Sequence, residues 1–189
     1  MIHARILCAG FGGQGVMSLG QLLAYGGMLE NRHVSWIPSY GPEMRGGTAH
    51  CCVVISDRPI GSPMVVNDAG CVIVMNSPSK HKFEKSVIPG GILLTNSSLI
   101  SEPATRRDIQ VYPIPAGDLA RDCGSSKSAN IVMLGAYLAL TGLVKEESII
   151  AAFDKVFGKK SPRFHSANRI ALAKGADAVA DLDRTRIAA

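Results

Sequence analysis

A glycine-rich turn between a predicted strand and a predicted helix constrains this chain more than any other part of its sequence. The apolar run Arg5–Ala9 leads into Gly10-Phe-Gly-Gly-Gln-Gly15, and Val16–Leu29 then carries apolar residues at helical spacing. A Gly-x-Gly-x-x-Gly turn in this position is the phosphate-binding fingerprint of dinucleotide-binding domains. The pattern therefore favours an α/β fold whose first turn faces an anionic group.

Each glycine of the turn has an expected role. In the fingerprint the first glycine forms the tight turn, the second lets backbone N–H groups approach a phosphate, and the third lets the helix pack on the strand. The candidate cofactor-binding residues are therefore Gly12, Gly13, Gln14 and Gly15. The amide of Gln14 is placed to bond to a ligand or to a neighbouring subunit. The alternative is that the glycines only allow a close turn and bind nothing.

The rest of the dinucleotide fingerprint is incomplete. It places an acidic residue at the end of the second strand, about 20 residues after the glycines, where the residue binds the ribose hydroxyls. The predicted second strand, Val34–Ile37, ends without a carboxylate, and Glu43 lies beyond it in a loop. This absence weakens the case for NAD.

The apolar pattern in the rest of the chain predicts alternating strands and helices. Only about ten residues separate the second and third strands, which is too few for an ordinary crossover helix. We expect a single Rossmann-like α/β domain over residues 1–189, with a mostly parallel sheet, flanking helices and a helical C-terminal third. Its predicted strands after the second are Thr48–Ile55, Cys71–Met75, Ile92–Thr95 and Gln110–Ile114, and its later helices are Lys80–Ser86, Asn130–Leu140 (with Ser128 as N-cap), Glu146–Phe157 and Pro162–Ala180.

The loop after the second strand is a second candidate site. It carries an aromatic hydroxyl, a carboxylate and a guanidinium within six residues, at Tyr40, Glu43 and Arg45. Arg45 is suited to clamp a carboxylate or phosphate, Glu43 to orient Arg45, and Tyr40 to stack or donate. The alternatives are an internal pair of Glu43 with Arg45, or an interface loop without a ligand.

One further polar residue follows a strand. Asn96 comes directly after Ile92–Thr95, so it is expected at the ligand-facing edge of the sheet. We assign it to the candidate cofactor-binding residues. The alternative is that its side chain only closes an Asx turn.

Composition excludes several functional classes. The net charge of +5 comes from 20 Lys and Arg against 15 Asp and Glu without a dense basic run, which is too diffuse for nucleic-acid binding. The longest apolar stretch, Ile131–Val144, falls short of the ~20 residues that a bilayer requires.

Five cysteines without a Cys-x-x-Cys pair indicate a reduced, cytoplasmic protein that holds no iron–sulfur cluster by itself. Scattered histidines indicate no metal site, and the motifs of hydrolases and P-loop enzymes are missing, so we assign no catalytic residue.

Several segments together resemble one family. Gly10–Gly15, Pro38–Thr48, Pro89–Ser98 and Asn130–Ala136 are similar to the gamma subunit of 2-oxoacid:ferredoxin oxidoreductases, the pyruvate/ketoisovalerate oxidoreductase gamma family. The likeness runs from about residue 3 to about residue 175. The second loop resembles the 2-oxoglutarate and branched-chain 2-oxoacid enzymes more than the pyruvate enzymes.

The resemblance implies a complex that oxidatively decarboxylates a 2-oxoacid to an acyl-CoA and passes electrons to ferredoxin. It implies alpha and beta subunits that bind thiamine diphosphate and Mg, and iron–sulfur clusters in a ferredoxin-like subunit or in beta. This chain would then support the CoA and active-site region and assembly, would bind none of these cofactors alone, and would be inactive in isolation. Whether two copies of this chain form a homodimer is left open by the resemblance.

Two other functions compete with this one. The first is a stand-alone NAD- or FAD-binding oxidoreductase that uses the glycine turn, although the missing acidic residue disfavours it. The second is a pure assembly scaffold, in which neither loop contacts a ligand.

Overall fold

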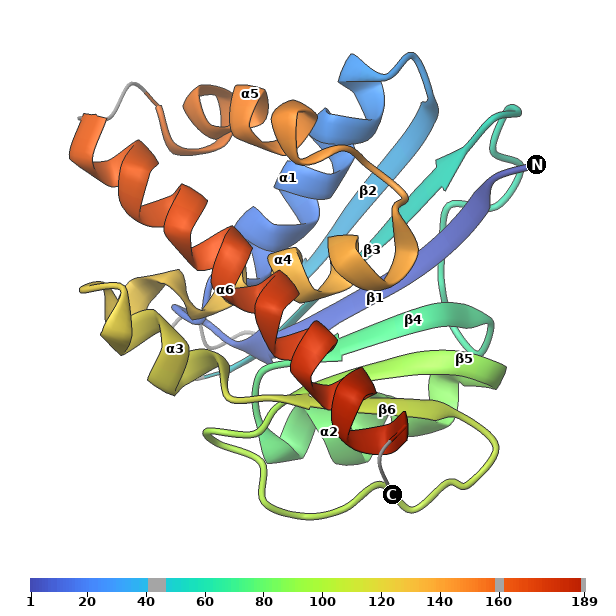
Figure 1. The fold of residues 1–189 in the computed structure, drawn as a ribbon. Helices are drawn as coiled ribbons and strands as arrows, with labels where there is room; N and C mark the ends of the chain where they lie inside the picture. Colours follow the sequence, from blue (N-terminus) through green and yellow to red (C-terminus); the bar gives the residue numbers. More distant parts are fainter. Residues whose placement is uncertain (41–46, 159–161, 188–189) are drawn as a thin grey trace.

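A mixed six-stranded sheet forms the centre of the computed structural model, which describes residues 1–40, 47–158 and 162–187 (Figure 1). The strand order is β2-β3-β1-β4-β5-β6. Only β3 runs against the others, because it pairs antiparallel with both β1 and β2, while β1, β4, β5 and β6 are mutually parallel. The strands are β1 (His3–Phe11), β2 (His33–Tyr40), β3 (Thr48–Ser56), β4 (Ala69–Val74), β5 (Val87–Asn96) and β6 (Gln110–Ile114).

Helices cover both faces of this sheet. On one face lie the first helix and the helices of the C-terminal third; on the other lies a short helix with a 3₁₀ turn (Figure 1). The larger layer contains α1 (Val16–Leu29), α3 (Ala116–Asp122), α4 (Ala129–Thr141), α5 (Glu146–Phe157) and α6 (Pro162–Ile187), and the smaller one contains α2 (Ser77–Phe83) and the turn Glu84–Ser86.

The apolar core has two parts because the central strands are buried on both faces. In β1, Ile6 and Cys8 pack under the larger helical layer, while Leu7 and Ala9 face α2 and the loops beside it. Alternation along a strand sends neighbouring side chains to opposite faces. These observations confirm the predicted α/β fold with a mostly parallel sheet. Within the described ranges, no helix is long and apolar enough to cross a membrane.

Two predicted boundaries are wrong. The second strand was expected to end at Ile37, but β2 continues through Pro38 to Tyr40. Proline has no N–H group to donate, and an edge strand such as β2 tolerates it. The segment Pro89–Gly91 was expected to precede a strand, yet it lies inside β5, where Gly90 has a φ of +76° and the pairing with β4 shifts register.

The predicted helix Lys80–Ser86 has a different start and end. It begins at Ser77, after Asn76, whose Oδ1 accepts a hydrogen bond from the N–H of Ser79 at 2.9 Å. This contact is a side-chain N-cap. The last residues of the predicted helix form the 3₁₀ turn instead.

The expected capping contact of Ser128 is also absent from the described structure. Ser128 stands at the N-cap position of α4, but its Oγ contacts the Oδ1 of Asn168 on α6 at 3.2 Å. The side chain therefore ties α4 to α6 rather than capping α4.

The two helices α4 and α6 touch backbone to backbone. A Cβ atom built on Gly135 would lie 2.0 Å from the carbonyl oxygen of Leu172, and one on Gly175 would lie 1.9 Å from that of Val132. Real Cβ atoms do not approach backbone oxygen this closely, so the helices can cross here only because both residues are glycine.

We predict that Gly135→Ala lowers the free energy of unfolding by about 3 kcal/mol, because the new methyl group forces α4 away from α6. Urea denaturation followed by circular dichroism measures the change. Gly61→Ala is the matched control, since a Cβ there meets no atom within 4 Å. An equal effect of the two substitutions would contradict the proposed crowding.

Candidate functional site

The site lies at the edge of the sheet where the parallel strands β1, β4, β5 and β6 end. The chain leaves β1 through the glycine loop, defined here as residues Gly10–Gly15, and enters α1 on one face. It leaves β4 into α2 on the opposite face. Open α/β sheets bind ligands at such a switch point, outside the carboxyl ends of the strands.

The structural roles expected for the glycines of the loop fall on different glycines in the structure. Gly10 does not form the turn: it lies in β1, where a Cβ would sit 2.7 Å from a methyl carbon of Val16. The turn uses Gly13 and Gly15 instead, with φ values of +95° and +74° that favour glycine. Gly15 closely approaches the side chain of Asn130 on α4, not the strand.

Gln14 holds the loop in place. Its Oε1 accepts hydrogen bonds from the N–H of Phe11 at 2.7 Å and from the Nδ2 of Asn76 at 2.8 Å. Its Nε2 lies 3.4 Å from the carbonyl oxygen of Met75. The side chain that was expected to reach a ligand or a neighbouring subunit thus braces the loop against the end of β4.

Asn96 is buried at the end of β5, with 1% of its surface exposed. Its Oδ1 accepts hydrogen bonds from the N–H of Ser98 at 3.3 Å and from the N–H of Gly117 at 3.4 Å. The first contact is the Asx turn that the sequence allowed, and the second ties β5 to the start of α3.

The second loop lies mostly outside the described residues. Glu43 and Arg45 both fall there, and Tyr40 is placed only by its backbone, which pairs with Ala49. On the far side of the loop, the carbonyl oxygen of Gly47 accepts a hydrogen bond from the N–H of Gly12 at 3.1 Å. The end of the second loop therefore lies against the glycine loop.

A pocket of about 280 Å³ opens beside the glycine loop and brings together predicted and unpredicted residues. Gly13, Gln14 and Asn96 form part of its wall, and the exposed cations Arg121 and Lys127 come from α3 and the turn before α4. No sequence motif marks either cation. The other lining residues are Met75, Ser98, Leu99, Gly117, Ser126 and Ala129.

The two cations differ in how they are held. Arg121 forms an ion pair with Asp118, whose other carboxylate oxygen accepts a hydrogen bond from Ser98 at 2.6 Å. Lys127 has no ion-pair partner in the part of the chain that the structure describes. Lys127 is therefore the cation more available to an anionic ligand.

A second pocket, of about 330 Å³, lies on the other side of Gly13. Gly12 and Gly15 line this one together with Phe11, Val16, Met17, Ser18 and Ala49. Gly13 borders both pockets, and a Cβ at Gly13 would meet no atom within 4 Å. The backbone of the loop is thus open to a ligand from two sides.

The cysteines beneath the loop are unsuited to chemistry. Hydrogen bonding with Cys51, together with burial, raises the pKa of Cys8, and burial raises the pKa of Cys71. Both thiols therefore stay protonated and unreactive at neutral pH. Within the described residues, no group of three or more His, Cys, Asp or Glu side chains is placed to hold a metal ion.

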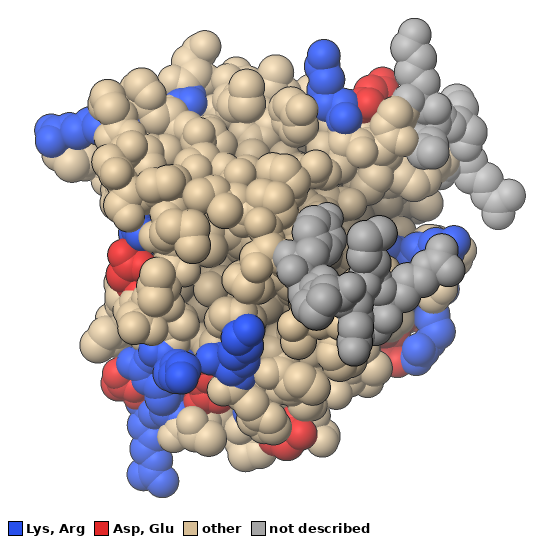
Figure 2. Space-filling view, turned by 180° about the vertical axis from the view of Figure 1, so that it is seen from behind, with Lys and Arg blue, Asp and Glu red and all other residues tan. Residues whose placement is uncertain are grey.

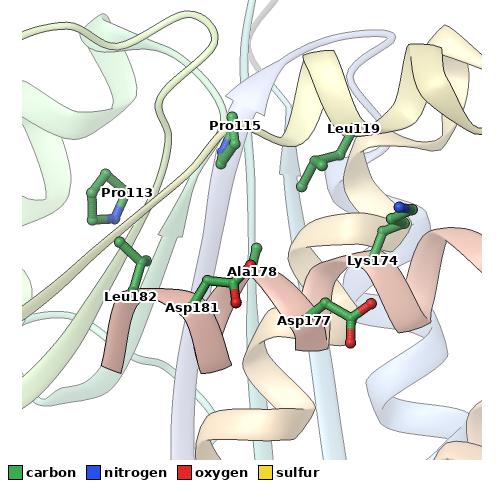
Figure 3. Close-up of a pocket in the computed structure, with 8 residues that line it drawn as sticks. All are labelled: Pro113, Pro115, Leu119, Lys174, Asp177, Ala178, Asp181 and Leu182. Atoms are coloured by element: carbon green, nitrogen blue, oxygen red, sulfur yellow. The ribbon is translucent and has the colours of Figure 1, made fainter. Parts of the chain in front are cut away.

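Another groove, of about 340 Å³, lies away from this edge. Pro113, Pro115 and Leu119 face Asp177 and Asp181 of α6 across it (Figure 3). Its lining sets two carboxylates against the single lysine Lys174, which makes it a poor phosphate site. Figure 2 shows the opposite face of the molecule, which is largely uncharged, with basic side chains gathered mainly near its lower left edge beside a few acidic ones.

These features define a Rossmann-like domain whose open sheet edge combines a glycine turn with exposed cations. The chain belongs to the pyruvate ferredoxin/flavodoxin oxidoreductase family, whose model matches residues 5–178. The resemblance inferred from the sequence is thereby confirmed.

Named relatives include subunits of several such enzymes. Ketoisovalerate oxidoreductase subunit VorA of Methanothermobacter thermautotrophicus is 44% identical over 160 residues, which cover 84% of this chain and 33% of VorA. 2-Oxoglutarate synthase subunit KorC of Methanocaldococcus jannaschii is 33% identical over 184 residues, which cover 96% of each chain. The chain thus spans about a third of VorA but nearly all of KorC. These relatives do not support a stand-alone NAD or FAD enzyme or a pure scaffold.

Solved structures share the fold. The gamma subunit of a keto/oxoacid ferredoxin oxidoreductase from Geobacter sulfurreducens superposes with a TM-score of 0.79 at 28% identity, covering 94% of this chain and 99% of that one. The 2-oxoglutarate:ferredoxin oxidoreductase of Magnetococcus marinus gives a TM-score of 0.87 at 23% identity, covering 96% and 32% of the two chains. At 23% identity, the match to the Magnetococcus marinus enzyme shows only that the fold is shared.

We predict that Gln14→Ala lowers the free energy of unfolding by about 2 kcal/mol, because it leaves the N–H of Phe11 and the amide of Asn76 without their shared acceptor. Gln110→Ala is the control: that glutamine is exposed on the edge strand β6, and its loss should cost about 0.5 kcal/mol. Urea denaturation of both variants tests the difference. Equal losses would show that Gln14 does not brace the loop.

Proposed function

We propose that this chain is a subunit of a 2-oxoacid:ferredoxin oxidoreductase. The complex would convert a 2-oxoacid, CoA and oxidised ferredoxin into an acyl-CoA, carbon dioxide and reduced ferredoxin. The observation that carries the proposal is the pocket at the switch point, where an open glycine backbone faces Lys127 and Arg121. The family membership of the chain and the names of its relatives support it.

Within that complex, this chain would bind the anionic part of CoA. An ammonium group and a guanidinium group attract phosphate, and Arg121 can also bind it through two parallel N–H groups. The open backbone at Gly13 allows close approach of a phosphate to the loop. Leu99, 57% exposed at the mouth of the pocket, offers an apolar contact to the uncharged part of the ligand.

The other cofactors do not fit this chain. Iron–sulfur clusters need several converging thiolates, whereas four of the five cysteines are buried in the sheet. As the family resemblance implies, thiamine diphosphate with Mg would be bound by alpha and beta subunits, and the clusters by beta or by a ferredoxin-like subunit. The residues of this chain would bind and orient CoA and exclude water from its approach, with the chemistry supplied by those partners.

For the 2-oxoacid itself, we infer a branched-chain substrate. The VorA relative is 44% identical, against 33% for a 2-oxoglutarate synthase subunit and 29% for the pyruvate synthase subunit PorC of Thermotoga maritima. Comparing 2-oxoisovalerate, 2-oxoglutarate and pyruvate as substrates of the purified complex tests this inference. A higher kcat/KM for either of the other two acids would overturn it.

We predict that the chain co-purifies from its native cells with larger subunits and that this complex reduces ferredoxin only when a 2-oxoacid and CoA are both present. The isolated chain, supplied with thiamine diphosphate, Mg and CoA, should be inactive. Activity of the isolated chain would contradict the proposal. Saturable micromolar binding of NADH or FAD to the isolated chain would instead favour the stand-alone enzyme.

We further predict that Lys127→Ala raises the KM for CoA about fivefold in the assembled complex, since an exposed charge-assisted contact contributes about 1 kcal/mol. The KM for the 2-oxoacid should stay unchanged. Lys174→Ala is the control, because Lys174 lines the separate groove on α6. If both variants leave the KM for CoA unchanged, this pocket does not bind CoA.

A further inference from the structure

One buried side chain outside the glycine loop bonds directly to it. Asn130, near the start of α4, donates from Nδ2 to the carbonyl oxygen of Gly15 at 3.1 Å. The same carbonyl accepts the N–H of Leu19 at 3.0 Å, within the first turn of α1. The end of the loop is therefore held by its own helix and by a residue 115 positions away in the sequence.

The contact is also steric. A Cβ built on Gly15 would lie 2.4 Å from the Nδ2 of Asn130 and 2.6 Å from its Cγ. The amide of Asn130 thus fills the space that a side chain at Gly15 would need. The two residues form one unit, in which the glycine makes room and the asparagine fixes the direction of the carbonyl group.

The helix that carries Asn130 is closely packed. The helix that carries it touches the backbone of α6 at Gly135 and Gly175, and the adjacent Ser128 bonds to Asn168. On the other side, Lys127 and Ala129 belong to the wall of the pocket beside the glycine loop. Asn130 therefore links the cationic wall to the loop that faces it.

Stability alone does not explain an asparagine here. Its Oδ1 is buried and has no hydrogen-bond partner within the described ranges. An unpaired buried acceptor costs free energy, so the contact of Nδ2 with Gly15 is made at the expense of the other end of the amide. Turning the amide over would set Oδ1 against the carbonyl oxygen of Gly15, which repels it, so the donor must face the loop.

We propose that Asn130 is a positioning residue for CoA binding: it sets the conformation of the glycine loop from outside, and so fixes the distance between the Gly13 backbone and the cation of Lys127. This inference rests on the proposed function. It assigns a role to a residue that contacts no substrate and acts only through Gly15.

The test compares Asn130→Asp with Asn168→Asp in the assembled complex. Both substitutions bury a carboxylate in the same region, but only the first removes a donated hydrogen bond, because the Nδ2 of Asn168 has no partner within the described ranges while its Oδ1 accepts from Ser128. Asn130→Asp should raise the KM for CoA five- to tenfold, leaving kcat and the KM for the 2-oxoacid within twofold. Asn168→Asp should leave all three unchanged. If the Asp variant does not assemble, Asn130→Ala removes the donor without adding charge.

Hydrogen exchange of the peptide that covers Phe11–Gly15 gives a second, independent measure. Faster exchange in the Asn130 variant than in the Asn168 variant, together with the higher KM for CoA, supports the proposal. Equal exchange in the two variants overturns it. Faster exchange with an unchanged KM for CoA would keep the loop-setting role of Asn130 and overturn the proposed CoA contact instead.

Discussion

Two side-chain amides hold the glycine loop from opposite sides, and the site depends on this double support. The amide of Gln14 ties the loop to Asn76 at the end of β4, and the amide of Asn130 ties it to α4. A glycine-rich segment loses much conformational entropy when it folds, so it needs such external contacts to keep one shape. With the loop fixed, the pockets on its two sides are fixed as well.

Several segments of the chain approach one another closely, and glycines at the contact points allow this. At Gly10 the strand passes close to α1, at Gly15 the loop meets Asn130, and at Gly135 and Gly175 two helices cross in contact. Each approach brings a distant segment of the chain toward the same sheet edge. The cation Lys127 lines the same pocket as Gly13 and stands just before α4, which packs on α6 and bonds to the loop through Asn130. Packing energy in the helical layer thus determines the geometry of a pocket at the edge of the sheet.

The sequence predicted the parts of this arrangement that depend on local pattern. Apolar periodicity located every strand and the longer helices, and the short link after the second strand indicated an interrupted parallel sheet, which β3 provides by running antiparallel. Residue roles within the loop were less predictable: Gly10 makes the close contact with α1 that was expected of Gly15, and Gly13 and Gly15 form the turn that was expected of Gly10, because the exact end of a strand depends on tertiary contacts. The place of Lys127 and Arg121 in the pocket could not be predicted, since no local sequence pattern indicates that they lie near a loop more than 100 residues earlier in the chain.

The chemistry of the pocket is that of a binding site. It offers backbone donors, two cations and a buried amide, all of which bind charge, but the described residues around it include no activated thiol and no metal-holding cluster. Such a set is suited to orienting an anionic ligand. The same domain spans nearly all of KorC and about a third of VorA, so it is found both as a separate subunit and within a longer chain. Either arrangement leaves the sheet edge at the carboxyl ends of the parallel strands open, because the helical layers cover the two faces of the sheet and not that edge.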